Sequence, residues 1–433
     1  MKQFRKVIHP DRTISYEPIE LIDKPISSGG EGGVFLLAGK DWWIVRYGTK
    51  DVRKRACAKL YNQTFLIKHE KELEKKLTYM IDRNNRPEHL DDGVVGLAQI
   101  CYPFAILYDA PNGRFVGFLM HFALEDSIPL TILTADRSPQ LYKKQRELGL
   151  LNQKHWELFQ KFCFPDATHT ATKRYAFLLN IASVVNYIHA TGKYVIADLK
   201  PDNFLITIHG GVSIVDINSI QVSDGKKNFF PSLVATPDYI PPELQTNPAG
   251  KKTVSYDLFS MAVVFYQVLT GTHPFNYSVK DGGPNLGTSI QEHIRGGHFA
   301  CGKSRKHFVL VSQHMRYDNL PESLKRLFQR AFEGSPNNRP TAREWMEAIK
   351  VVWTGRPVSP ASAPQKTPEA APQNTAKPKP TPKKPARTNA PPVTATMPQR
   401  IPYAWKMCCP MCGHTYLDPV TSRYCHNCGT ARK

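Results

Sequence analysis

The chain has 433 residues, a formal net charge of +20 and a hydrophobic fraction of 41%. This length favours more than one domain, because domains usually run about 100 to 200 residues. No apolar run approaches the roughly 18 residues needed to span a bilayer, and the first ten residues lack the apolar core of a signal peptide. We therefore expect a cytoplasmic protein that makes no membrane contact.

The positive charge is unevenly distributed along the chain. Residues 354–433 hold 12 Lys and Arg against 2 Asp and Glu, which is half of the whole excess. Such a tail favours acidic partners, although a solvated cationic tail without any partner explains it equally well. Five of the nine cysteines lie within 408–428, unlike the chain-wide pattern of a disulfide scaffold, so we expect a reducing compartment.

In chain order, the first elements are strand-like and the later ones are helical. The stretches "GGVFLL", "WWIVRY", "CAKLYN" and "RFVGFLMHF" predict strands, whereas helical periodicity dominates after about residue 140. Residues 172–192 place apolar side chains on one helical face and end at Gly192. We expect an α+β fold with an extension at 1–19, a β-rich N-lobe at 20–125 and a helical C-lobe at 126–353.

The stretch "SSGGEGGVF" begins at Ser27 and is the first candidate for chemistry. Successive glycines let the backbone approach phosphates and direct N–H groups at them. Taken alone the pattern is weak, because glycine-rich turns are common. The candidate nucleotide-binding residues of this loop are Ser28, Gly29, Gly30, Glu31, Gly32, Gly33 and Val34.

Lys59 follows in an apolar strand context, where its ammonium could neutralise nucleotide phosphates. Such a lysine needs an acidic partner, and the next segment predicts a helix with Leu73 and Leu77 facing inward. Glu70 and Glu74 both lie beside that face. We choose Glu74, because inward-facing positions follow it at i+3, i+4 and i+7, although a solvated charge pair explains either glutamate.

The stretch "YVIADLKPDNFLI" supplies a base, a cation and a metal ligand in one loop. Asp198 could accept the proton of an attacking hydroxyl, and Lys200 could neutralise the transferring phosphoryl group. Eighteen residues after Asp198, Asp216 leaves an apolar strand-like run. Asn203 and Asp216 are candidate ligands for Mg²⁺, which prefers oxygen ligands and few protein carboxylates.

Together with "VATPDYIPPE" at 234–243 and "NNRPTAREW" downstream, these motifs resemble the eukaryotic-like Ser/Thr protein kinases over about residues 20–352. The resemblance implies a bilobal kinase fold that uses ATP and Mg²⁺, with Asp198 and Lys200 as catalytic residues. It implies that Thr236 contacts both of them and positions Ser/Thr substrates. Structural roles are implied for Asp257, which would tie the catalytic loop to its helix, and for Arg339, which would pair with Glu243.

The sequence departs from this family in three places. Ser27 replaces the first loop glycine, Ile196-Ala197 replaces His-Arg, and Ile217-Asn218 replaces Phe-Gly after Asp216. Because the missing Arg receives an activation-loop phosphate, activation by loop phosphorylation is not expected. Because of these departures, the alternative is a pseudokinase scaffold, which binds nucleotide or a partner without transferring phosphate. An active kinase is favoured because no residue with a direct chemical role is lost.

The last 80 residues predict a tether and a metal site. Residues 354–402 are rich in Pro, Lys and Ala and contain no aromatic residue, which indicates a flexible linker. Residues 403–433 predict a zinc ribbon that recruits a substrate or partner; nucleic acid is a less favoured target, because the tether lacks aromatic residues to stack on bases. The Zn²⁺ ligands, from two Cys-x₂-Cys pairs, are Cys409, Cys412, Cys425 and Cys428.

With the ribbon included, the chain resembles a bacterial kinase subgroup of tellurite-resistance-type gene clusters. The stretches "GGEGGVF", "GFLM", "DINSIQV" and "THPF" carry this similarity. The resemblance implies two partners. One is a protein substrate, for which a von Willebrand A-domain protein is the candidate, and the other is a PP2C-type phosphatase.

Overall fold

A computed structural model describes most of the chain up to residue 355. The described residues are 1–9, 11–39, 42–47, 50–82, 94–95, 98–134, 147, 153–163, 167–225, 229–245, 247 and 251–355. Residues Met1–Arg356 form one compact unit. The predicted tether and zinc ribbon, including Cys409, Cys412, Cys425 and Cys428, lie outside the described residues. Over the described ranges, no helix is both long and apolar enough to cross a membrane.

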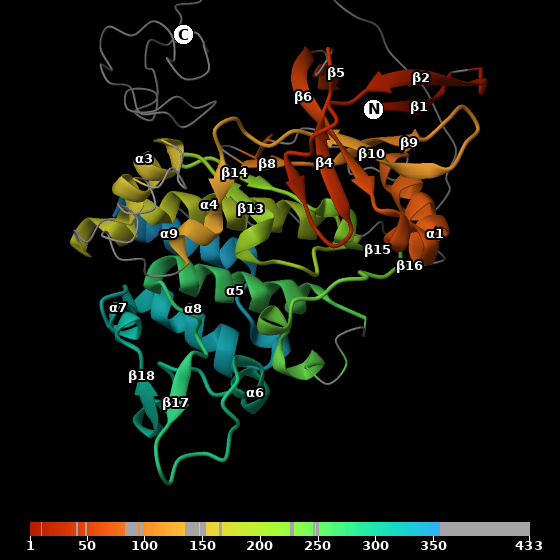
Figure 1. Cartoon of the computed structure of the whole chain (residues 1–433). Coiled ribbons are helices and arrows are strands. Elements are labelled where there is room, and N and C mark those ends of the chain that lie inside the picture. Colours follow the sequence, from red (N-terminus) through yellow and green to blue (C-terminus); the bar gives the residue numbers. More distant parts are fainter. Residues whose placement is uncertain are drawn as a thin grey trace, which may run out of the picture. The chain divides into compact units, whose positions relative to one another are not determined.

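The N-terminal half is built on an eight-stranded sheet (Figure 1). The strand order is β2-β1-β9-β10-β6-β4-β3, and β5 pairs with β6 outside this path. The strands are β1 (Lys2–Ile8), β2 (Ile14–Glu20), β3 (Ser27–Ser28), β4 (Gly32–Leu36), β5 (Trp42–Tyr47), β6 (Lys50–Tyr61), β9 (Pro103–Tyr108) and β10 (Phe115–His121).

Most of residues 1–19, which we expected to form an N-terminal extension, lie in two strands of this sheet. Strand β1 pairs with β2 along its whole length and with β9, where Phe4 faces Tyr108. Tyr16 of β2 packs edge to face on Tyr108, with ring centroids 5.8 Å apart. The many charged residues of this segment obscure its strand character, because they fall on positions that remain partly exposed.

Asn62 caps the start of helix α1 (Gln63–Ile81), because its side-chain oxygen accepts a hydrogen bond from the Phe65 N–H at 2.8 Å. The helix packs against β9 and β10. Leu73 and Leu77 are buried on its inner face, as predicted. Lys76, however, is also buried there. One face of α1 is therefore apolar apart from a single lysine.

The C-terminal half is mainly helical (Figure 1). Helix α4 contacts α5 and α9, and α5 also contacts α8. Nearly every residue of α5 is buried, as expected of a helix that is apolar on all sides. The predicted inner face of α4 is confirmed by the burial of Ile181, Val184 and Ile188. The helices are α3 (Gln153–Phe162), α4 (Ala167–Ala190), α5 (Val254–Thr270), α6 (Ile290–Gly296), α7 (Met315–Asp318), α8 (Glu322–Glu333) and α9 (Ala342–Thr354).

Short strands hold the loops of the candidate site. They form three small sheets, ordered β11-β13-β14-β8-β7, β12-β15-β16 and β17-β18. The loop with Asp198 connects β12 to β13, and Asp216 follows β14. The β-rich first half and helical second half agree with the predicted α+β class. The strands are β7 (Val94–Val95), β8 (Ala98–Ile100), β11 (Ile128–Pro129), β12 (Tyr194–Val195), β13 (Phe204–Ile206), β14 (Val212–Ile214), β15 (Gln221–Ser223), β16 (Phe229–Phe230), β17 (Tyr277–Val279) and β18 (Phe308–Leu310).

Candidate active site

Most of the predicted site residues line one cleft, although they are far apart in the sequence. Residues of the glycine-rich loop and of β6 line it together with loops of the helical half. Gly33 and Glu74 are the predicted nucleotide-binding residues that do not line it. The predicted residues that do are Ser28, Gly29, Gly30, Glu31, Gly32, Val34, Lys59, Lys200, Asn203, Asp216 and Thr236.

The glycine-rich loop is fixed at its base. The Gly29 N–H donates to the Gly32 carbonyl at 2.9 Å, which closes the turn. A Cβ atom on Gly32 would overlap the backbone of Leu60, so only glycine fits there. Asn62 holds the loop from the start of α1, because its Nδ2 donates to the Gly30 carbonyl at 2.6 Å and its backbone N–H donates to the Glu31 carbonyl at 2.8 Å.

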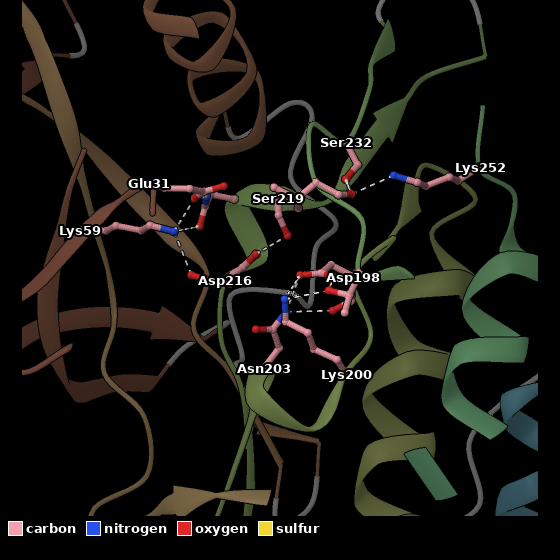
Figure 2. Close-up of polar contacts among 12 residues, drawn as sticks. Glu31, Lys59, Asp198, Lys200, Asn203, Asp216, Ser219, Ser232 and Lys252 are labelled. Atoms are coloured by element: carbon pink, nitrogen blue, oxygen red, sulfur yellow. Dashed lines mark hydrogen bonds and ion pairs between the residues drawn. The ribbon is translucent and has the colours of Figure 1, made fainter. Parts of the chain in front are cut away.

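Lys59 is buried at the back of the cleft and lies among three oxygen acceptors. Its Nζ is 2.8 Å from Glu31 Oε2, 2.9 Å from Asp216 Oδ1 and 3.2 Å from Asn218 Oδ1 (Figure 2). Burial by itself would lower the pKa of this ammonium. The carboxylates of Asp216 and Glu31 outweigh burial and raise the pKa above its ordinary value, so Lys59 stays charged.

The prediction that Glu74 pairs with Lys59 is wrong. Glu74 Oε1 accepts a hydrogen bond from the Tyr108 hydroxyl at 2.6 Å, and Glu70 pairs with Arg114 at 3.2 Å. Both carboxylates therefore point to β9 and the turn that follows it. The physical reason is the helix register: the face of α1 that is buried runs through Leu73, and the residue after it is rotated by about 100°.

Asp198, Lys200 and Thr236 contact one another. Thr236 Oγ1 donates to Asp198 Oδ1 at 2.8 Å, and Lys200 Nζ lies 2.8 Å from Asp198 Oδ2. Lys200 Nζ also donates to Thr236 Oγ1 at 3.0 Å. Asp198 is only 6% exposed, so these contacts fix the direction of its carboxylate. The structure thus places the predicted base, cation and threonine in one constellation.

Asn203 and Asp216 lie at the same end of two paired strands. Asn203 precedes β13 and Asp216 follows β14, and the Val215 N–H donates to the Asn203 carbonyl at 2.9 Å. Asn203 Nδ2 donates to the carbonyl and carboxylate of Asp198, which leaves its amide oxygen as an acceptor. Asp216 has the left-handed backbone φ of 57°. An amide oxygen and a carboxylate lining one cleft fit the ligand preference of Mg²⁺.

The fully buried Asp257 holds the loop before Asp198. Its carboxylate accepts from the backbone N–H of Ile196 at 2.7 Å and of Ala197 at 2.8 Å. His189 Nε2 lies 2.8 Å from the same carboxylate. Ala197 has φ 68°, a left-handed conformation that costs an alanine about 1 to 2 kcal/mol. The two hydrogen bonds that Asp257 accepts stabilise this unfavourable turn.

Arg339 and Glu243 form a bidentate ion pair in the helical half. Arg339 Nη2 lies 2.8 Å from Glu243 Oε2, and Nη1 contacts the other carboxylate oxygen. Nη1 also donates to the Ser255 carbonyl at 3.1 Å. Because Arg339 is buried, this pair anchors the end of the segment that carries Thr236.

Sequence reasoning missed the roles of two polar residues that interact with Glu31. Asn218 stood out only as a departure from the expected triplet, yet its Oδ1 accepts from Lys59 and its Nδ2 donates to Glu31 Oε2 at 3.3 Å. Lys76 was overlooked because lysines on a helix are usually solvated. Burial lowers the pKa of Lys76 to about 7, with attraction to Glu31 and repulsion from Lys252 as smaller effects. Lys76 lies three residues after Leu73 and therefore on the same face of the helix, and this spacing could have predicted its burial.

Known proteins resemble this chain over the part that carries the catalytic loop. Residues 150–351, slightly less than half of the chain, match the protein kinase domain family. This range contains Asp198 and Asp216, whereas the glycine-rich loop and Lys59 precede it.

Three curated relatives illustrate the range of similarity. The 3-phosphoinositide-dependent protein kinase 1 of Arabidopsis thaliana is 32% identical over 110 residues, which is 23% of this chain and 22% of that protein. The probable serine/threonine protein kinase IRE4 of the same plant is 25% identical over 292 residues, or 61% and 22%. A putative serine/threonine-protein kinase of Mycoplasma pneumoniae is 29% identical over 172 residues, or 36% and 39%.

The chain spans less than two thirds of the length of each of these relatives. The range that matches the family includes Asp198 and the two residues that contact it, Lys200 and Thr236. Residues 150–351 are therefore similar to a protein kinase domain, and serine/threonine protein kinases from a plant and a bacterium are among the relatives of this chain.

Proposed function

We propose that the protein is an ATP-dependent serine/threonine protein kinase. The observation that carries the proposal is the contact of Asp198 with Lys200 and Thr236, two residues that line a cleft together with Lys59 and Asp216. A protein kinase domain implies ATP and Mg²⁺ as ligands. When bound, Mg²⁺-ATP supplies the phosphoryl group and much of the charge neutralisation for its transfer.

Each residue of the constellation has a defined task in this reaction. Asp198 accepts the proton of a substrate hydroxyl while that oxygen forms a bond to the γ-phosphorus and the bond to ADP breaks. Lys200 neutralises charge on the transferred group, and Thr236 holds both side chains in place. Asn203 and Asp216 would hold Mg²⁺ through their free oxygens, and Lys59 would hold the nucleotide phosphates.

The test is transfer of ³²P from [γ-³²P]ATP to a protein acceptor by the full-length chain. Asp198→Asn removes the base while keeping the side-chain shape, and we expect transfer to fall at least about 100-fold, because general-base catalysis contributes factors of this order. Asp281→Asn, which removes an exposed carboxylate near β17, is the matched control and should transfer normally. Equal transfer by wild type and Asp198→Asn would refute the proposal. Mg²⁺-ATP binding by a wild type that transfers nothing would support the pseudokinase alternative.

We further propose that residues 403–433 form a zinc ribbon tethered by 354–402 and that it recruits a protein partner. The support is the spacing of the four cysteines in the sequence. The purified full-length chain should contain about one zinc ion per molecule by elemental analysis. Cys409→Ser with Cys425→Ser should abolish this zinc, whereas Cys57→Ser should not; equal zinc in all three proteins would exclude the site.

The proposed substrate class is a protein with a von Willebrand A domain, and the proposed opposing enzyme is a PP2C-type phosphatase. The support is the resemblance of "GGEGGVF" and "DINSIQV" to the kinase subgroup described above. Mass spectrometry of phosphosites, after incubation of the chain and Mg²⁺-ATP with the products of neighbouring genes, tests the assignment. Phosphorylation of none of them would count against it.

A further inference from the structure

A residue of the glycine-rich loop and a residue at which the sequence departs from the kinase pattern meet at the same lysine. Glu31 is the charged residue among the loop glycines, and Asn218 takes the place of glycine two residues after Asp216. Asn218 Nδ2 donates to Glu31 Oε2 at 3.3 Å, and both side chains accept from Lys59 Nζ. Figure 2 shows the Lys59 side chain reaching between Glu31 and Asp216. Glu31, Asn218 and Lys59 therefore form one contact network.

Glu31 is held firmly enough to position another residue. Its backbone carbonyl accepts from the Asn62 N–H, and the neighbouring Gly30 carbonyl accepts from Asn62 Nδ2. The next residue, Gly32, lies opposite Tyr61 in the ladder between β4 and β6, the strand that carries Lys59. The glutamate is therefore fixed to the end of β6 and to the first turn of α1.

Helix α1 offers no carboxylate to Lys59 among its described contacts. Glu74 accepts from Tyr108, and Glu70 pairs with Arg114. The buried face of the helix presents Lys76 instead, a cation for which the described residues provide no ion pair. The carboxylates that contact the Lys59 ammonium, Glu31 and Asp216, therefore come from elements other than α1.

We propose that Glu31 is the positioning residue for Lys59 and that Asn218 keeps the Glu31 carboxylate in place. The inference rests on the proposed kinase function, in which Lys59 holds the nucleotide phosphates. Asp216 is the other carboxylate on Lys59, and it must also serve as a metal ligand. Glu31 has no such role as a metal ligand, so its contact with the ammonium directs Lys59 into the cleft throughout the reaction. The glycine-rich loop, rather than α1, thereby completes the site.

The experiment compares Glu31→Gln with Glu74→Gln in the full-length chain. Each substitution removes one negative charge and keeps the side-chain shape, so the pair separates the loop carboxylate from the helix carboxylate. For Glu31→Gln we expect kcat/KM for ATP to fall roughly tenfold or more, because a charge-assisted contact to Lys59 is lost. For Glu74→Gln we expect a value within about twofold of wild type, since the amide oxygen can still accept from Tyr108.

A second measurement reports on Lys59 itself and does not require catalysis. The pH dependence of Lys59 acylation is followed by peptide mass spectrometry in the wild type and both variants. Removing a carboxylate that raises the pKa of Lys59 should move the midpoint of its labelling to lower pH in Glu31→Gln. The midpoint should not move in Glu74→Gln. A purely structural role of Glu31 would lower the melting temperature without this shift.

The outcomes distinguish the inference from the kinase proposal. An unchanged midpoint and unchanged ATP kinetics in Glu31→Gln would overturn the inference, as would a larger effect of Glu74→Gln. Tighter ATP binding by Glu31→Gln would also overturn it, because the carboxylate would then compete with the phosphates. A wild type that transfers no phosphate would refute the kinase proposal, and the labelling midpoints would still decide the role of Glu31.

Discussion

Thr236 Oγ1 donates to Asp198 Oδ1 at 2.8 Å and accepts from Lys200 Nζ at 3.0 Å, so one hydroxyl links the two predicted catalytic side chains. Thr236→Val keeps the shape but removes both hydrogen bonds. We expect kcat to fall by about tenfold or more, because each lost contact loosens a group that must be aligned for transfer. Thr236→Ser retains the hydroxyl and should keep most of the activity. Steady-state phosphorylation of a protein acceptor measures both, and equal rates for Val and Ser would contradict the expectation.

Because burial lowers the pKa of Lys76, the stability of the protein should depend on pH. Its pKa is about 7 in the folded chain and near 10.5 when unfolded, so the unfolded state binds more protons between these values. The stability of the wild type should therefore gain from this residue as pH rises from about 7 to 10.5, and the full cost of the buried charge should apply below pH 7.

Lys76→Met removes this titration. The variant should be more stable than wild type at pH 6, and the difference should shrink towards pH 10. Urea unfolding of both proteins at pH 6, 8 and 10 provides the measurement. A stability difference that is independent of pH would show that Lys76 titrates normally.

Substitution of Asp257 should lower the stability of the protein. Asp257→Ala leaves the N–H groups of Ile196 and Ala197 without their buried acceptor, and it leaves Ala197 in its left-handed conformation unsupported. We expect a destabilisation of about 2 to 5 kcal/mol, within the range for removing one member of a buried charged network. Urea unfolding measures the loss. A destabilisation below about 0.5 kcal/mol, typical of surface substitutions, would contradict the role assigned to Asp257.

The Asp198 loop and the helices were accessible from the sequence because their information is local. Asp198, Lys200 and Asn203 lie within six residues of one another, and one turn of chain brings them together. The buried face of α4 was predictable because a helix repeats its environment every 3.6 residues. The contact of Thr236 with Asp198 was predicted from the resemblance to the kinase family, which rests on the ordered set of motifs, and spacing alone would not have predicted it.

The acidic partner of Lys59 could not be predicted in the same way. It depends on the ladder between β4 and β6, in which Val34 faces Lys59, and on the turn that carries Glu31 back over this strand. Local sequence does not contain that register. Strand β1 was missed for a related reason, because its pairing with β9 joins residues about 100 positions apart, such as Phe4 and Tyr108.

Asn62 performs two tasks with two different atoms of one amide. Its oxygen caps α1 by accepting from Phe65, and its nitrogen donates to the Gly30 carbonyl. Aspartate also caps helices well but has no nitrogen to donate. Asn62→Asp therefore preserves the helix cap and removes the side-chain hydrogen bond to Gly30, while the backbone N–H of residue 62 still holds the Glu31 carbonyl.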